Sequence, residues 1–89
     1  MRIHHLYSIP LKGVQMQEVQ LFVDKVNYCL IHLSPGDVKD PEYMFEWLYE
    51  KFKDWNQISR AIEKIKKSSP DNRRRTWDYL WSKIKEVLD

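Results

Sequence analysis

The residues best able to do chemistry in this sequence are the lysines and arginines between residues 59 and 75. This stretch holds seven basic residues against two acidic ones, whereas the rest of the chain is close to neutral or acidic. The basic residues are Arg60, Lys64, Lys66, Lys67, Arg73, Arg74 and Arg75. Guanidinium and ammonium groups bind phosphates through charge-assisted hydrogen bonds. The stretch therefore predicts a site for nucleic acid or for another polyanion or acidic surface.

Tyr79 adds an aromatic ring to this basic stretch. On a helix predicted over 70–88, Arg75 and Tyr79 are four residues apart and therefore point in the same direction. The predicted helix has Ser69 as its N-cap and Pro70 as its first residue. Its first N–H groups would contribute to phosphate binding, and the tyrosine ring could stack on a base or contact an arginine.

The same charges have a simpler interpretation, because runs of charge more often keep a surface hydrated than bind a ligand. Arg74 with Asp78, and Arg75 with Asp71, stand at the i, i+4 spacing of ion pairs on a helix surface. In favour of a site, three arginines at the N-terminal end of a helix depart from the usual rule, because the helix dipole is positive there, and such departures often mark functional sites. The sequence leaves both interpretations open.

A second group of side chains favours protein recognition. Four large side chains lie off the main apolar stripes of the first two predicted helices, namely Leu21, Tyr28, Tyr43 and Trp47. If they are exposed together, they form the kind of aromatic patch that anchors a protein partner or a homo-oligomer. Alternatively, the apolar side chains of residues 1–12 cover them. The alternative function is therefore a protein-interaction or self-assembly module.

Histidine and cysteine are the candidate zinc ligands. Cys29 and His32 are one helical turn apart, and His4 with His5 could complete a set of four. Adjacent histidines usually point apart, however, and neither a Cys-x-x-Cys pair nor the familiar spaced pair of histidines is present. We therefore expect no metal and no cofactor, with Cys29 as a small buried side chain and His32 on the surface.

Signatures of enzymes are missing from the sequence. Gly13 and Gly36 are the only glycines, so there is no glycine-rich phosphate loop. No arrangement of Ser, Cys, His and Asp suggests an activated nucleophile. Glu42, Glu46 and Glu50 repeat along one helix flank in the manner of a solubilising face. We therefore expect a binding domain without catalytic residues.

Length and composition limit the class of protein. Eighty-nine residues, of which 43% are hydrophobic and 31% charged, predict one globular domain. The single cysteine argues against a disulfide framework and favours an intracellular protein of the cytoplasm or nucleus. No apolar run is long enough to span a membrane, and no signal peptide is apparent.

The elements that must position these side chains are predicted to be helical. We expect an all-α, compact four-helix bundle with an extended N-terminal arm, forming a single domain over residues 1–89. The helices are expected near 14–33, 41–54, 56–67 and 70–88, and the arm at 1–12. Alternation between Ile3 and Ile9 favours the arm. The alternative is a hairpin in which residues 14–16 return past a turn at residues 10–13.

Apolar periodicity also predicts which helix faces are buried. The expected stripe of the first helix is Met16, Val19, Phe22, Val23, Val26, Cys29, Leu30 and Leu33. The second has Met44, Phe45, Leu48, Phe52 and Trp55, and the third has Ile58, Ala61, Ile62 and Ile65. The last has Trp77, Leu80, Trp81, Ile84, Val87 and Leu88. Asp40 and Pro41 are the expected N-cap and first residue of the second helix.

Overall fold

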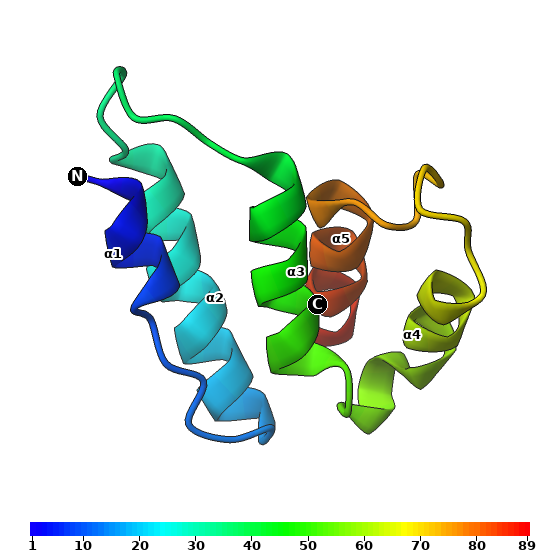
Figure 1. The fold of residues 1–89 in the computed structure, drawn as a ribbon. Helices are drawn as coiled ribbons and strands as arrows, with labels where there is room; N and C mark the ends of the chain where they lie inside the picture. The colour runs from blue at the N-terminus through cyan, green and yellow to red at the C-terminus, as the bar shows by residue number, and fades with distance from the viewer. The chain divides into compact units, whose positions relative to one another are not determined.

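The computed structural model describes residues 1–89, which form five α-helices and one turn of 3₁₀ helix, with no β-strand (Figure 1). The helices are α1 Ile3–Tyr7, α2 Met16–Ile31, α3 Pro41–Phe52, α4 Ser59–Lys66 and α5 Trp77–Leu88, and the 3₁₀ turn η1 is Asn56–Ile58. The prediction of an all-α fold is confirmed. The helices belong to two compact units, which we call unit 1 (Met1–Lys39) and unit 2 (Asp40–Asp89).

Unit 1 begins with the short helix α1, so the prediction of an extended arm over residues 1–12 is wrong. The N–H of Ile3 donates to the carboxylate of Asp37, which satisfies one of the N–H groups that a helix start leaves free. The ring of His5 accepts from the N–H of Arg2. Leu6 is completely buried. These interactions outweigh an alternation of only a few residues, and the alternative hairpin does not form.

The segment after α2 holds the start of the chain in place. The N–H of Ser34 donates to the carbonyl of Met1 at 2.8 Å, and the N–H of Asp37 donates to the carbonyl of Ser34 at 2.9 Å. A helix of five residues is not stable by itself in water. The stability of α1 therefore comes from these bonds and from its packing on α2.

Most of the apolar stripe predicted for α2 is buried, but Met16, the first residue of the helix, is 44% exposed, and Leu30 and Leu33 are half-buried. Its fully or almost fully buried side chains are Val19, Phe22, Val23, Val26 and Cys29. The helix starts at Met16 and ends at Ile31, two residues inside each predicted end. Its last turn is closed by the N–H of His32, which donates to the carbonyl of Tyr28 at 3.2 Å.

Unit 2 opens with α3, which starts where the sequence predicts. The Asp40 carboxylate accepts from the N–H groups of Glu42 and Tyr43 at 3.1 and 3.2 Å. Pro41 follows as the first helical residue, where its missing N–H costs nothing. Within this unit α3 packs on α5, and α5 also contacts η1, which leads directly into α4 (Figure 1).

The core of unit 2 consists of apolar side chains from α3, η1, α4 and α5, together with the residue before η1. They are Met44, Phe45, Leu48, Phe52, Trp55, Ile58, Ala61, Ile62, Ile65, Leu80, Trp81 and Ile84. Every one belongs to a predicted apolar stripe, so the predicted inward faces are confirmed. Full burial of a large apolar side chain contributes about 1.5–3 kcal/mol. No polar or charged residue is buried, so apolar packing is what holds these helices together.

Three tryptophans join α3 to α5. Trp47 stacks on Trp77 with ring centres 6.4 Å apart and an interplanar angle of 9°. Trp77 stacks in turn on Trp81, at 5.1 Å and 25°. The two indoles of α5 lie on one helix face because they are four residues apart. Stacked rings bury large areas in a defined orientation, so this row helps to set how α5 lies on α3.

The helix α5 begins at Trp77, so the predicted start near residue 70 is wrong. The side-chain oxygen of Thr76 accepts from the N–H of Tyr79 at 3.3 Å, which makes Thr76 the N-cap. Asp78 then lies in the first turn, where a negative charge suits the helix dipole. The three arginines precede the helix, so the unfavourable placement that the sequence suggested does not occur.

Two successive turns occupy residues 69–75, ahead of α5. The N–H of Asn72 donates to the carbonyl of Ser69 at 3.0 Å, and the N–H of Arg75 donates to the carbonyl of Asn72 at 2.9 Å. The side-chain oxygen of Asn72 also accepts from the N–H of Arg74 at 2.9 Å. Asparagine favours such turns because its side chain competes with the helix for backbone N–H groups. This competition explains why the helix does not extend back to Pro70.

Two substitutions distinguish the observed start of α5 from the predicted one. Thr76→Ala removes the observed cap and is expected to lower the free energy of unfolding by about 1 kcal/mol. Ser69→Ala, at a residue that caps no helix, is expected to change it by less than about 0.5 kcal/mol. Urea unfolding followed by circular dichroism measures both. A cost at Ser69 equal to that at Thr76 would show that the helix starts earlier.

Candidate functional site

Two adjoining hollows lie between α4 and α5 in unit 2, and together we call them the basic groove. The smaller hollow has a volume of about 240 Å³ and the larger one about 600 Å³. Lys64, Tyr79 and Lys83 line both, so the hollows are continuous along these side chains. The charged residues of the basic groove are Arg60, Lys64, Arg73, Arg74, Asp78, Lys83 and Glu86.

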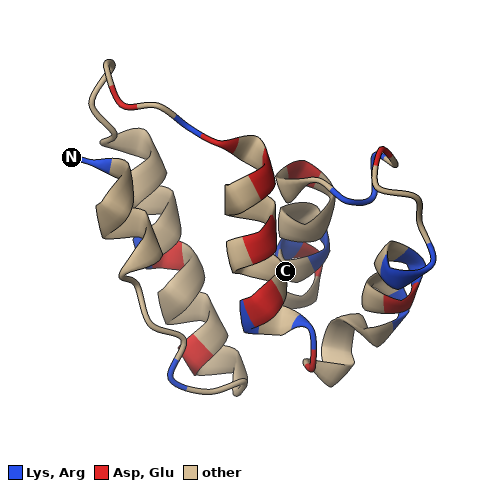
Figure 2. Ribbon diagram, in the orientation of Figure 1, with Lys and Arg blue, Asp and Glu red and all other residues tan.

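The positive charge of the basic groove is largely uncompensated. Five cationic side chains face two carboxylates. Figure 2 shows basic residues on α4, on the segment after it and on α5, whereas acidic residues mark successive turns of α3. Among the five cations, Lys83 makes an ion pair with Glu86 at 3.6 Å. The other four cations take part in no ion pair.

Five of the eight residues predicted to bind a polyanion line the basic groove. They are Arg60, Lys64, Arg73, Arg74 and Tyr79. Arg60 and Lys64 share one face of α4 because they are four residues apart. The two turns of residues 69–75 place Arg73 and Arg74 at the same hollow as Lys64. The residues that line the groove therefore come from separate segments of the sequence.

Lys83 lines both hollows, although the sequence reasoning leaves it out. Its ammonium nitrogen lies 5.4 Å from the centre of the Tyr79 ring, a distance at which a cation and an aromatic ring attract each other. The two residues are four apart on α5, which is the spacing of neighbours on a helix face. That spacing from Tyr79 is the signal by which the sequence could have identified Lys83.

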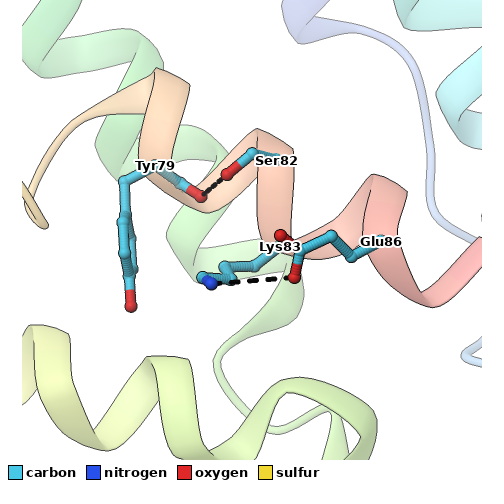
Figure 3. Close-up of polar contacts among 4 residues, drawn as sticks. All are labelled: Tyr79, Ser82, Lys83 and Glu86. Carbon is cyan, nitrogen blue, oxygen red and sulfur yellow. Dashed lines mark hydrogen bonds and ion pairs between the residues drawn. The ribbon is translucent and has the colours of Figure 1, made fainter.

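Tyr79 occupies the middle of the basic groove. Its side chain projects from α5 toward α4, beside the ion pair of Lys83 with Glu86 (Figure 3). The ring is partly exposed and lines both hollows. The hydroxyl of Ser82 donates to the backbone carbonyl of Tyr79 at 2.7 Å, so this bond does not involve the ring (Figure 3). The partly exposed ring therefore lies between two groups of cations, with the Lys83 ammonium over one of its faces.

Arg75 lies outside the basic groove. Its guanidinium group lies 5.7 Å from the centre of the Phe45 ring and donates to the carbonyl of Ile65 at 3.3 Å. The predicted shared direction of Arg75 and Tyr79 is wrong, because it requires both residues to be on one helix and Arg75 precedes α5. Arg75 instead connects the turns before α5 to α3 and α4.

Two more of the predicted residues line neither hollow. Lys66 makes an ion pair with Glu63 at 3.8 Å. Lys67 is the C-cap residue of α4, and its N–H donates to the carbonyl of Glu63 at 3.1 Å. Both lysine side chains are exposed. They extend the positive surface of α4 without lining the groove.

The residues predicted to bind a protein partner are divided between the two units. Leu21 and Tyr28 lie seven residues apart on α2 in unit 1, and their exposed fractions are 48% and 57%. Tyr28 also stacks on His32, with ring centres 4.1 Å apart. An exposed apolar side chain and an exposed aromatic ring therefore share one face of α2.

Tyr43 and Trp47 lie on α3 in unit 2. A shallow hollow of about 420 Å³ is lined by Tyr43, Glu46, Trp47, Glu50 and Lys51. The indole of Trp47 stacks on Trp77, and Lys51 lies 5.5 Å from the centre of its ring. Trp47 therefore contributes to the packing of α3 on α5, whatever else it binds.

The candidate zinc ligands do not form a cluster. The structure contains no group of three or more His, Cys, Asp or Glu side chains that could hold a metal ion. Cys29 is buried, and that burial raises the pKa of its thiol above its ordinary value. His32 is exposed, and its ring nitrogen Nδ1 lies 2.8 Å from the carbonyl oxygen of Tyr28.

Comparison with protein family models, with curated proteins and with solved structures gives no match for this chain. None of its helices combines the length and the apolar character that crossing a membrane requires.

Arg75→Ala tests the structural role of this arginine. The substitution removes the contact with the Phe45 ring and the hydrogen bond to the Ile65 carbonyl, so it is expected to lower the free energy of unfolding by about 1 kcal/mol. The matched control, Arg73→Ala, removes an exposed groove cation and is expected to cost less than about 0.5 kcal/mol. Urea unfolding measures both. Equal costs would contradict the assignment of Arg75 to packing.

Alkylation tests the burial of Cys29. Because burial raises the thiol pKa and hides the sulfur, iodoacetamide at pH near 9 is expected to react at least about tenfold more slowly with the folded chain than with the urea-unfolded chain. Mass spectrometry of samples quenched over time gives both rates. Similar rates in the two states would show that Cys29 is accessible.

Proposed function

We propose that this chain is a non-enzymatic binding domain that associates with nucleic acid or another polyanion through the basic groove. One observation carries the proposal: five cations and two carboxylates surround a concave surface, and four of those cations have no ion-pair partner. A polyanion supplies the missing negative charge along its whole length.

The energetics of like charges support this proposal. Cations that converge on one groove repel each other, and the repulsion is only partly screened when they lie within about 8 Å of each other at physiological salt. Bound phosphates replace that repulsion by attraction and release counterions from the polyanion. The affinity is therefore expected to be dominated by charge and to fall steeply as salt rises.

Hydration alone is a weaker explanation for these side chains. A cation that serves only solubility needs no particular neighbour, and the exposed Lys67, which lines neither hollow, fits that description. The groove cations instead come from α4, from the turns before α5 and from α5, and they converge on Tyr79. Convergence from separate segments is what a binding site requires.

A second candidate function is protein recognition or self-association through α2. It is favoured by the exposure of Leu21, Tyr28 and Ile31, the last of which is 77% exposed. Aromatic and aliphatic side chains of this kind anchor protein interfaces. Sedimentation of the wild type and of Tyr28→Ser at high protein concentration tests self-association, which the substitution should weaken.

Three further properties of the protein remain predictions from its sequence. These are the four-helix bundle, the single domain over residues 1–89, and the intracellular location in cytoplasm or nucleus. The absence of catalytic residues, metal and cofactor likewise belongs to the proposal of a binding function.

A pair of charge-matched variants tests the function. The groove variant carries Arg60→Gln, Lys64→Gln, Arg73→Gln and Arg74→Gln. The control variant carries Lys12→Gln, Lys25→Gln, Lys39→Gln and Lys53→Gln, so it loses the same charge from exposed lysines that line neither hollow and lie outside the predicted basic stretch. Circular dichroism establishes that both fold. Binding to a labelled oligonucleotide and to heparin is then measured at about 50 and about 200 mM salt.

The groove variant is expected to bind at least about tenfold more weakly at the lower salt, with a salt slope reduced by up to about 3, because up to four phosphate contacts are lost. The control variant should stay within about threefold of the wild type, because its substituted lysines do not line the groove and salt screens their remaining effect. Equal weakening of both variants would show that net charge alone is responsible. No binding by the wild type at about 50 mM salt would remove the proposal.

A further inference from the structure

The position of Tyr79 restricts what kind of polyanion the basic groove can accept. The ring lines both hollows, with Arg60 at the smaller hollow and with Arg73 and Arg74 at the larger one. A ligand that lies along the whole groove must therefore pass the tyrosine ring between two groups of cations. Heparin and polyphosphate carry anionic groups but no aromatic ring that could stack on a tyrosine.

Nucleic acid supplies both kinds of group in alternation. Phosphates recur along its backbone, and each base offers a flat π-face that stacks on an aromatic side chain whatever the sequence. The Lys83 ammonium lies over one face of the Tyr79 ring, 5.4 Å from its centre, and pairs with Glu86, so a base would stack on the other face. The larger hollow, at about 600 Å³, is within the usual range of sites that enclose a small aromatic ligand.

The position of the bases decides whether the groove suits single-stranded or double-stranded nucleic acid. In a duplex the bases are paired and stacked on each other, so a concave groove between two helices meets mainly the phosphates. In a single strand the bases are free to turn outward and stack on an aromatic side chain. A tyrosine at the centre of a concave cationic surface therefore favours a single strand.

We propose that the basic groove binds single-stranded nucleic acid, with one base stacked on Tyr79. Lys64 and Arg60 contact the phosphates on one side of that base, and Arg73 and Arg74 contact those on the other. This inference rests on the proposed function and adds the class of ligand to it. It also assigns Tyr79 a role that charge alone does not give.

The test compares ligands that differ in bases and in strand number, using the full chain. The ligands are a mixed-sequence single strand about 12 nucleotides long, a hairpin duplex with the same number of phosphates, and inorganic polyphosphate. The variants are Tyr79→Leu, which removes the ring, and Tyr79→Phe, which keeps the ring and removes the hydroxyl. Fluorescence anisotropy at low salt gives each dissociation constant.

Tyr79→Leu is expected to weaken binding to the single strand about tenfold, because one stacked base is lost, and to leave binding to polyphosphate within about twofold. Tyr79→Phe should bind all three ligands as the wild type does. The wild type should prefer the single strand to the duplex. Equal affinity of Tyr79→Leu and wild type for the single strand, or tighter binding of the duplex, would overturn the inference.

A second measurement needs no substitution in the protein. An oligonucleotide made of abasic sites keeps the phosphates of the single strand and lacks the bases. The wild type should bind it about tenfold more weakly than the complete strand, and equal binding would overturn the stacking. Failure of the proposed function looks different, because then polyphosphate and both nucleic acids show no salt-dependent binding at all.

Discussion

The hydroxyl of Thr76 is the interaction on which the arrangement of the arginines depends. It donates to the carbonyl of Arg73 at 2.6 Å and accepts from the N–H of Tyr79 at 3.3 Å, so it joins the turns before α5 to the helix itself. If α5 began earlier, the arginines would follow helical periodicity and spread around its circumference. Because it begins after them, Arg73 and Arg74 line the basic groove and Arg75 packs on Phe45.

Apolar packing stabilises unit 2 without help from the cations of the basic groove. The core of unit 2 contains no polar side chain, and its three ion pairs lie on the surface, where such pairs contribute little to stability. The three stacked tryptophans and the aliphatic side chains of α4 therefore stabilise the fold, and the basic residues between 59 and 75 are not needed for its stability. Arg75 is the exception, since it contacts Phe45 and Ile65.

Much of unit 2 could be predicted from the sequence because apolar periodicity and helix caps are local signals. These signals predict the apolar stripes from Met44 to Ile65 and the Asp40 cap. They do not predict the start of α5, because Ser69 and Thr76 are both acceptable caps and the choice between them depends on the turn that Asn72 forms. Lys83 was missed although its spacing from Tyr79 places both on one face of α5. The position of α4 adds that this face lines a hollow. The helix α1 depends on Asp37, which is distant in sequence, so short alternation near Ile3 was misleading.

The most direct test of the account is to map the binding surface on the full chain. Amide chemical shifts of the ¹⁵N-labelled protein would be recorded while a single-stranded oligonucleotide is added at low salt and again at high salt. The shifts are expected to concentrate on α4, on residues 72–76 and on the first turns of α5, and to disappear at high salt. Shifts centred on α2 or α3, or no shifts at low salt, would contradict that expectation.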